Sequence, residues 1–289
     1  MRRLTKNIVA ETGFQWANVG AAITEDGIIL IDCPVRPTDS REWQKELRSL
    51  SPLGLRYLIS TDYHGDHSTG GAFIEGVTTI APERVYEEIA KLQEKSTFTK
   101  EIFIETLRDQ GFKEEAEEII KAVIPLPKIC FEDSLILHAR PLTFQIRRLG
   151  GHSPACSVVF IPEEKVLFAG DVVIEERNPG MGDANLRQWI NALEWIEDLP
   201  VEHIVPGHGE ICGMEVVRRL KEYFQMIWKD MENMVRVGRT KAEAVASDSF
   251  GKLFWADTSR GAYWLQQRRD SFRKRLERVY DEVKGEIGR

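Results

Sequence analysis

The stretch TDYHGDHSTGG, residues 61–71, directly follows a short apolar run, residues 57–60, which predicts a buried strand. Within six residues it holds four side chains that can ligate a metal: Asp62, His64, Asp66 and His67. Carboxylates and imidazoles in a loop at a strand end are what zinc, iron and manganese sites require. The stretch therefore predicts a strand-to-helix loop that carries a metal site rather than packed core.

Three further loops share this composition. His152 stands in GGHSP, Asp171 ends VLFAGD, and His208 stands in PGHG. Glycine beside a ligand lets the backbone approach a metal closely and adopt positive φ. Any one of these side chains is as readily explained as a turn residue, but their joint occurrence favours a metal site. His138 and His203 lie in or beside predicted strands without glycine, so we interpret them as structural.

Two strand-rich halves, each followed by helices, organise the chain. The first half predicts strands at 19–24, 28–31 and 57–60, a helix at 41–50 with its N-cap within 37–40, and amphipathic helices at about 82–122 with a break at Gly111. The second half predicts strands at 135–138, 142–149, 156–161, 166–168 and 203–205, and a helix at 186–199. Such a pattern is typical of a layered α/β architecture in which two sheets pack face to face.

Residues 1–212 are predicted to form the main domain, with a helical insertion at about 82–122. Residues 213–289 are predicted to be a helical segment that packs on it. This segment carries aromatic and aliphatic residues at helical spacing: Tyr223, Phe224, Met226, Ile227, Trp228, Phe250, Phe254, Trp255, Tyr263 and Trp264. Such spacing favours packed helices, and both a cover over the site and a homodimer interface stay open.

Composition and charge exclude several classes of protein. The 289 residues are 42% hydrophobic and 29% charged, as in ordinary globular proteins. The formal net charge of −7 would repel a phosphate backbone, so no nucleic-acid partner is expected. The sequence contains no run of about 18 apolar residues, which a membrane span would need. It also has no apolar stretch of about 7–15 residues near the N-terminus, which an export signal would need. Widely spaced cysteines without a CxxC pair favour free thiols in the cytoplasm: Cys33, Cys130, Cys156 and Cys212.

In their order along the chain, the candidate ligands resemble the metallo-β-lactamase superfamily, whose signature HxHxDH is followed by a His, a bridging Asp and a final His. The resemblance runs from about Gly20 to Gly209. It implies an αββα sandwich with the site at the edge between the sheets, and two divalent ions, zinc first. One ion would be held by Asp62, His64 and His152, the other by Asp66, His67 and His208, with Asp171 bridging them.

Asp62 departs from the signature, because it stands where the family has its first histidine. A carboxylate oxygen is a harder donor than imidazole, so Asp62 favours iron or manganese over zinc, or weakens the first site. Two divalent ions give +4, three carboxylates −3 and a shared hydroxide −1, so the site would be neutral. Its water would be less acidic than in the family's usual site, which has two carboxylates because a histidine stands in place of Asp62. The alternative is that Asp62 only orients His64.

The resemblance implies a metal-dependent hydrolase that delivers water to an ester, thioester, lactone or amide bond of a small molecule. Asp66 is the expected catalytic residue, because it could orient the water or accept its proton. Tyr63 could donate a hydrogen bond to a developing oxyanion, or could pack under the loop. Two alternatives stay open: an iron-dependent oxygen- or sulfur-oxidising enzyme on the same fold, and a degenerate, non-catalytic binder of a metal or ligand.

Overall fold

Two β-sheets form the centre of the protein. The computed structural model describes residues 1–95, 101–175, 179–251 and 262–288. The first sheet has the strand order β1 (Arg2–Arg3), β2 (Ile8–Glu11), β3 (Val19–Thr24), β4 (Gly27–Ile31), β5 (Leu55–Ile59), β6 (Thr78–Pro82) and β7 (Ile129–Phe131). The second has the order β12 (His203–His208), β11 (Val166–Ile174), β10 (Ser157–Ile161), β9 (Leu142–Arg148) and β8 (Ser134–Ala139).

The sheets pack face to face through apolar side chains that alternate along their strands. Ile29 and Ile31 of β4 face the same core as Phe144 and Ile146 of β9, and Phe168 of β11 lies among them. All are buried. Because successive side chains of a strand point to opposite faces, their neighbours along each strand point away from this core. This core holds the two sheets in a fixed relation.

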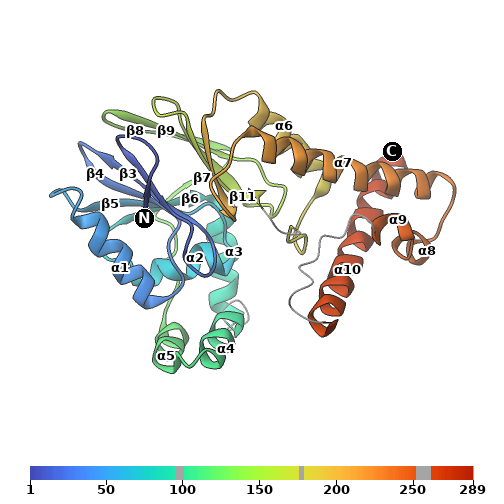
Figure 1. Ribbon diagram of the computed structural model, residues 1–289, viewed down its shortest axis with the longest axis horizontal. Helices are drawn as coiled ribbons and strands as arrows, with labels where there is room; N and C mark the ends of the chain where they lie inside the picture. The colour runs from blue at the N-terminus through green and yellow to red at the C-terminus, as the bar shows by residue number, and fades with distance from the viewer. Residues whose placement is uncertain (96–100, 176–178, 252–261, 289) are drawn as a thin grey trace.

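Helices cover both outer faces (Figure 1). On the first sheet's side lie α1 (Pro37–Arg48), α2 (Gly65–Ser68), the 3₁₀ turn η1 (Thr69–Phe73), α3 (Glu83–Lys95), α4 (Glu101–Asp109) and α5 (Lys113–Lys121). On the second sheet's side lie α6 (Leu186–Glu197) and α7 (Met214–Arg236), followed by α8 (Lys241–Val245), α9 (Asp248–Gly251) and α10 (Ala262–Ile287). The predicted αββα sandwich with added C-terminal helices is confirmed.

Helix α1 is amphipathic and buries one face. Its Trp43 and Leu47 pack against Leu30 and Leu58 on the outer face of the first sheet. The predicted start of this helix is wrong, because the helix begins at Pro37, where the sequence suggested an N-cap. Proline at the first helical position has a φ already suited to the helix and needs no hydrogen bond from its nitrogen.

Helices α7 to α10 continue the outer core of the second sheet. Phe224, Ile227 and Phe250 are buried in one cluster with α6, and so are Leu276 and Val279 of α10. Phe254, Trp255 and the side chains of Tyr263 and Trp264 lie outside the described residues. The division of the chain at residue 212 and the homodimer remain predictions. None of the described helices is both long and apolar enough to cross a membrane.

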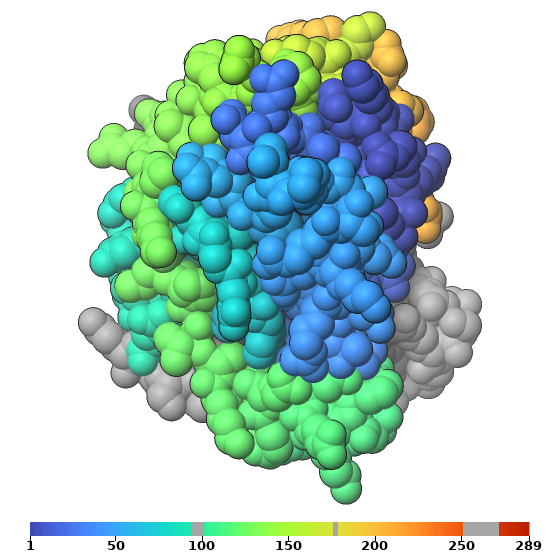
Figure 2. All heavy atoms as spheres, turned by 90° about the vertical axis from the view of Figure 1, so that its left-hand side faces the viewer, coloured from blue at the N-terminus to red at the C-terminus, as the bar shows by residue number. Residues whose placement is uncertain are grey.

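The face turned away from the C-terminal helices is formed by the N-terminal part of the chain. In Figure 2 the blue atoms of the first sheet and α1 occupy the middle and upper right of this face, light-green atoms of later strands cover its upper left, and the green atoms of α4 and α5 form its lower end. Helices α3 to α5 occupy the range where the sequence predicts an insertion. Gly111, between α4 and α5, has φ of 87°, in agreement with the predicted break.

Strand β11 is longer than predicted, and this matters for the site. It runs from Val166 to Ile174, so Asp171 lies within the strand and not after it. Gly170 adopts φ of 48°, and the pairing with β12 shifts register between Phe168 and Gly170. A bulge of this kind turns a side chain to a new direction without ending the strand.

Gly20 allows a close contact between the sheets. A Cβ added there would lie 1.9 Å from Cε1 of Phe168. We expect Gly20→Ala to lower the free energy of unfolding by about 1–3 kcal/mol, as overpacked cores do. Denaturant titration measures this. Gly285→Ala, in open space on α10, is the matched control and should cause no loss; equal stability of the Gly20 variant and the parent would contradict the close packing.

Candidate metal centre

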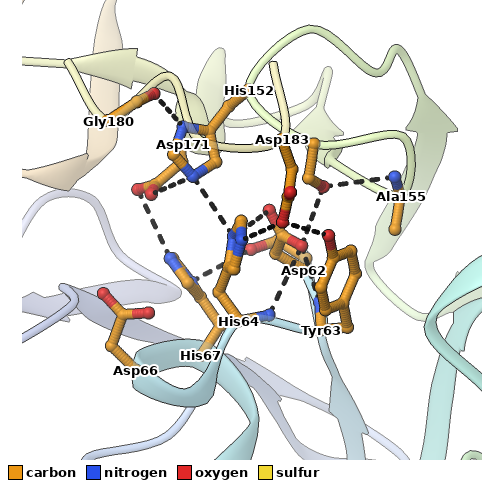
Figure 3. A network of polar contacts seen from close by, with 12 residues as sticks. Asp62, Tyr63, His64, Asp66, His67, His152, Ala155, Asp171, Gly180 and Asp183 are labelled. Atoms are coloured by element: carbon orange, nitrogen blue, oxygen red, sulfur yellow. Dashed lines mark hydrogen bonds and ion pairs between the residues drawn. The ribbon is translucent and has the colours of Figure 1, made fainter. Parts of the chain in front are cut away.

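All seven predicted ligands meet at one edge of the sandwich. Asp62 follows β5, His64 directly precedes α2, and Asp66 and His67 lie within α2, while His152 follows β9 and His208 ends β12. Figure 3 shows the side chains from the different loops pointing toward one another. Strand ends from both sheets therefore supply one cluster, as the sequence predicts.

Asp62, His64 and His152 form the first group. Their ligand atoms all lie within 4.8 Å of one another. Nδ1 of His64 lies 3.3 Å from Oδ2 of Asp62 and 3.2 Å from Nε2 of His152. These three atoms therefore face a common point.

Asp66, His67 and His208 form the second group, with the same spread of ligand atoms. Nε2 of His208 lies 3.1 Å from Oδ2 of Asp66. His67 is fully buried, whereas Asp66 and His208 are partly exposed. The second group is therefore reached by solvent on the side of Asp66 and His208.

Asp171 lies between the two groups. Its Oδ2 is 3.2 Å from Nε2 of His152 in the first group. Its Oδ1 is 3.3 Å from Nε2 of His67 and 3.4 Å from Nε2 of His208 in the second. One buried carboxylate thus presents one oxygen to each group.

Each of three histidines has its other ring nitrogen held by an acceptor. Nδ1 of His67 donates to Oδ2 of Asp32 at 2.9 Å, and Nδ1 of His152 donates to the carbonyl of Gly180 at 2.8 Å. Nε2 of His64 lies 3.3 Å from Oδ2 of Asp183, to which it donates. Because these acceptors fix the outer protons, the inner nitrogens of the neutral rings carry lone pairs directed into the cluster.

This arrangement fits metal ions. Two inner lone pairs, those of His64 and His152, face each other at 3.2 Å and would repel unless a cation lay beside them. Nε2 of His67 and Oδ1 of Asp171 are buried without a hydrogen-bond partner among the described residues. Buried polar atoms normally have partners, and a cation lying between these two atoms would supply one. Imidazoles and carboxylates are the donor set of zinc, iron and manganese.

Asp62 presents its two oxygens differently. Oδ1 accepts from the backbone N–H of Tyr63 at 2.7 Å and from Oγ of Ser153 at 2.9 Å, while Oδ2 faces the inner nitrogen of His64. Burial would raise the pKa of Asp62, but the neighbouring His64 holds it below its ordinary value. Since Asp183 holds the outer nitrogen of His64, this geometry favours Asp62 as a ligand over an orienting role.

Asp32 is a functional residue that the sequence reasoning missed. It follows β4 with φ of 55°, and its oxygens accept from the backbone N–H of Thr61 at 2.8 Å and from Oγ1 of Thr61 at 2.6 Å, as well as from His67. It therefore fixes both the loop after β5 and the ring of His67. A carboxylate at the end of the apolar run 28–31 was the available signal.

Asn18 and Asp183 were also missed. Nδ2 of Asn18 donates to the carbonyls of Pro206 and Gly209, both at 2.8 Å, and so holds the loop of His208. In that loop a Cβ on Gly207 would fall 1.9 Å from Oδ1 of Asp171, so only glycine fits beside the bridging carboxylate. The local sequence reveals neither Asn18 nor Asp183 as functional, because their contacts join segments that are far apart in the chain.

Tyr63 does not act as the suggested oxyanion donor in this geometry. Its hydroxyl donates its single proton to Oδ2 of Asp183 at 2.7 Å. Its ring packs beside the cluster of Ala81, Val85 and Ile89. The packing alternative therefore describes Tyr63 better, and burial raises the pKa of its phenol.

Comparisons of the chain with known proteins identify its family. The family model described as "Metallo-beta-lactamase superfamily" matches residues 17–208. The chain is 23% identical over 200 residues to "Beta-lactamase-like protein 2 homolog" of Caenorhabditis elegans, covering 69% of this chain and 57% of that protein. It is 26% identical over 158 residues to "Metallo-beta-lactamase type 2" of Bacteroides fragilis, covering 50% and 59%. It spans less than two thirds of either relative's length.

A solved structure extends the likeness to the C-terminal helices. A metallo-beta-lactamase family protein from Thermus thermophilus superposes with a TM-score of 0.67 at 19% identity, covering 99% of this chain and 95% of that one. At this identity the likeness shows the fold alone.

Without metal, protons must serve as the cations of this cluster. Burial lowers the pKa of His208, but Asp171 and Asp66 outweigh it and raise the value from 6.5 to about 9. A raised pKa stabilises the fold fully below about pH 6.5, and that stability is lost as the pH rises through about 9. We expect the free energy of unfolding of chelator-treated protein to fall by roughly 1–3 kcal/mol over that range.

Urea titrations at several pH values measure this loss. His208→Gln, which cannot gain the proton, should reduce the slope against pH, while His138→Gln, on the exposed edge of β8, should keep it. Stability that stays level or rises between pH 6.5 and 9 would contradict the charge assignment.

Proposed function

The chain belongs to the metallo-beta-lactamase superfamily, and we propose that it is a binuclear metal-dependent hydrolase acting on an ester, thioester, lactone or amide bond of a small molecule. The observation that carries the proposal is the position of Asp171, whose two oxygens face the ligand atoms of both groups. A single buried carboxylate between two sets of imidazoles is suited to join two ions.

In this proposal Asp62, His64 and His152 hold one ion, and Asp66, His67 and His208 hold the other. Asp171 bridges them. Zinc is the first choice for a set rich in imidazole, and the third carboxylate, Asp62, makes iron or manganese the alternatives. When bound, the ions supply Lewis acidity and bring the pKa of a shared water close to neutrality, so that no side chain need act as nucleophile.

Asp66 is the carboxylate best placed to handle the attacking water's proton. Its side chain is 22% exposed, compared with 4% for Asp171 and 0% for Asp62. Burial raises and the charge of His67 lowers its pKa, and the net value of about 2 keeps it ionised. An ionised carboxylate that solvent reaches can orient a water or accept a proton from it.

Asp32, Gly180 and Asp183 keep the ligands aligned. Each accepts the outer N–H of one histidine, so each ring is fixed with its lone pair inward. The expected benefit is a preorganised site in which little rearrangement accompanies binding or turnover.

We also propose a cytoplasmic setting, because the four cysteines are widely spaced and all are free thiols. We propose no nucleic-acid partner, because the net charge is negative.

A second candidate is an iron-dependent oxygen- or sulfur-oxidising enzyme on the same fold. The inward oxygen of Asp62 favours it, because a harder donor at the first site suits iron. The degenerate binder is less well supported, because all seven ligand candidates lie together. Metal identity distinguishes the first two.

We expect protein purified without added metal to carry about two ions per chain, mostly zinc, by elemental mass spectrometry. Chelation should abolish hydrolysis of aryl ester, thioester and lactone probes, and zinc should restore it. His208→Ala should lose about one ion and at least 100-fold in activity, on the order of a lost catalytic group, while His138→Ala should match the parent. A parent with no tightly bound metal would contradict the proposal, and predominant iron would favour the oxidase.

Asp62 sets the charge of the site in this proposal. Asp62→His and Asp62→Asn both raise the net charge by one, so the acidic limb of kcat/KM against pH should shift down by roughly one unit. Profiles unchanged in both variants would show that Asp62 is no ligand. One ion in the parent and two in Asp62→His would instead show that Asp62 disables the first site.

A further inference from the structure

Residues 179–185, which directly precede α6, supply two of the groups that hold the first site. The carbonyl of Gly180 accepts from Nδ1 of His152, and the carboxylate of Asp183 accepts from Nε2 of His64 and from the hydroxyl of Tyr63 (Figure 3). No described helix or strand includes residues 179–185. This segment is held partly by the body of the protein, because the backbone N–H of Asn185 donates to the carbonyl of Gly151 at 2.8 Å and Met181 and Ala184 are buried in the cluster with α6.

Helix α10 adds three polar contacts to the backbone of this segment and of Leu186. Nη1 of Arg275 donates to the carbonyl of Pro179 at 2.9 Å, and Nη1 of Arg278 donates to the carbonyl of Gly182 at 2.6 Å. Oε2 of Glu282 accepts from the backbone N–H of Leu186, the first residue of α6, at 2.8 Å. The spacing of three and four residues places these side chains on one face of α10.

Another face of α10 anchors the helix to the body of the protein. Leu276, Val279 and Val283 are 1%, 2% and 0% exposed, and they pack in the cluster that includes α6 and α7. Figure 1 shows α10 beside α7, with the yellow segment before α6 reaching toward it. The contacts to residues 179–186 thus start from a packed element.

We propose that α10 is a positioning element for the first metal site. Arg275, Arg278 and Glu282 fix residues 179–186, and these residues hold the rings of His152 and His64 with their inner nitrogens toward Asp62. The inference rests on the proposed binuclear function. Beyond that function, the inference states that three residues of the C-terminal helices, outside the family match, govern the affinity of one of the two ions.

Among the described residues, the supports of the second site's histidines come from the sandwich and not from α10. Its His67 is held by Asp32 at the end of β4, and the loop of its His208 is held by Asn18. Both supports belong to the sandwich itself. Loosening α10 should therefore weaken one site and leave the other unchanged, which a general loss of stability would not do.

The test uses the full chain carrying Arg275→Ala and Arg278→Ala together. Stepwise zinc affinities come from competition with a chromophoric chelator, and the same titration of His208→Ala, which lacks a ligand of the second site, assigns each affinity to its site. In this variant we expect the first site to lose about 10–100-fold in affinity, the usual effect of removing a partner of a ligating histidine. The second site should keep its parent affinity.

Two matched variants separate positioning from general stability. Lys241→Ala removes an ion pair between α8 and Asp281 of α10, at 2.6 Å, away from the segment, and should keep both affinities. Asp183→Ala removes the partly exposed acceptor itself and should weaken the first site, whereas Asp183→Asn, which keeps an acceptor oxygen, should restore most of the affinity. Asp183→Ala keeps the test decisive if the double arginine variant does not fold.

The outcomes distinguish the two proposals. A parent chain that binds no pair of ions overturns the binuclear function, and the inference with it. A parent that binds two ions, beside an Asp183→Ala or a folded double arginine variant with both parent affinities, overturns the inference alone. In metal-free protein, amide hydrogen exchange across 179–186 should be faster in the double variant than in Lys241→Ala, and equal rates would also overturn the inference.

Discussion

The constraint on which the candidate site of this protein depends is the close approach of four imidazoles and three carboxylates, most of them buried. Their inner lone pairs repel at about 3.2–3.4 Å, as between His64 and His152 or Asp171 and His208. Only cations make such a cluster favourable, and burying unpaired charges costs several kcal/mol each. The surrounding features serve this constraint: glycines that let the loops approach, and acceptors such as Asp32 that fix each ring.

The sandwich meets the constraint by holding two sheets rigidly and using their ends. The core around Ile31 and Phe144 fixes the sheets, so the loops after β5 and β9 and the end of β12 return to one place. Asp171 differs, because a bulge at Gly170 aims it from inside β11. A bridging carboxylate borne on a strand is held more tightly than one on a loop, which suits its place between two ions.

Much of this was predictable from the sequence, and the remainder has physical reasons. Adjacent glycine indicated His64, His152 and His208, and the alternating strands predicted the layers. Asp32, Asn18 and Asp183 were not predicted, because their partners lie on other segments and a single carboxylate or amide carries no local pattern. The predicted start of α1 was wrong because Pro37 suits a first helical turn as well as a cap region. The edge strand β7, three residues long, gives too short a pattern to recognise.

The tie between α10 and residues 179–186 has a consequence for biosynthesis. Every ligand precedes α10 along the chain, and Asp32 and Asn18, which brace the second site, are made before all seven ligands. Chains fold as they emerge from the ribosome. The second ion can therefore be captured as soon as His208 and its loop have emerged, while the first waits for the final helix to dock, so maturation of the centre would be ordered in time by the sequence itself.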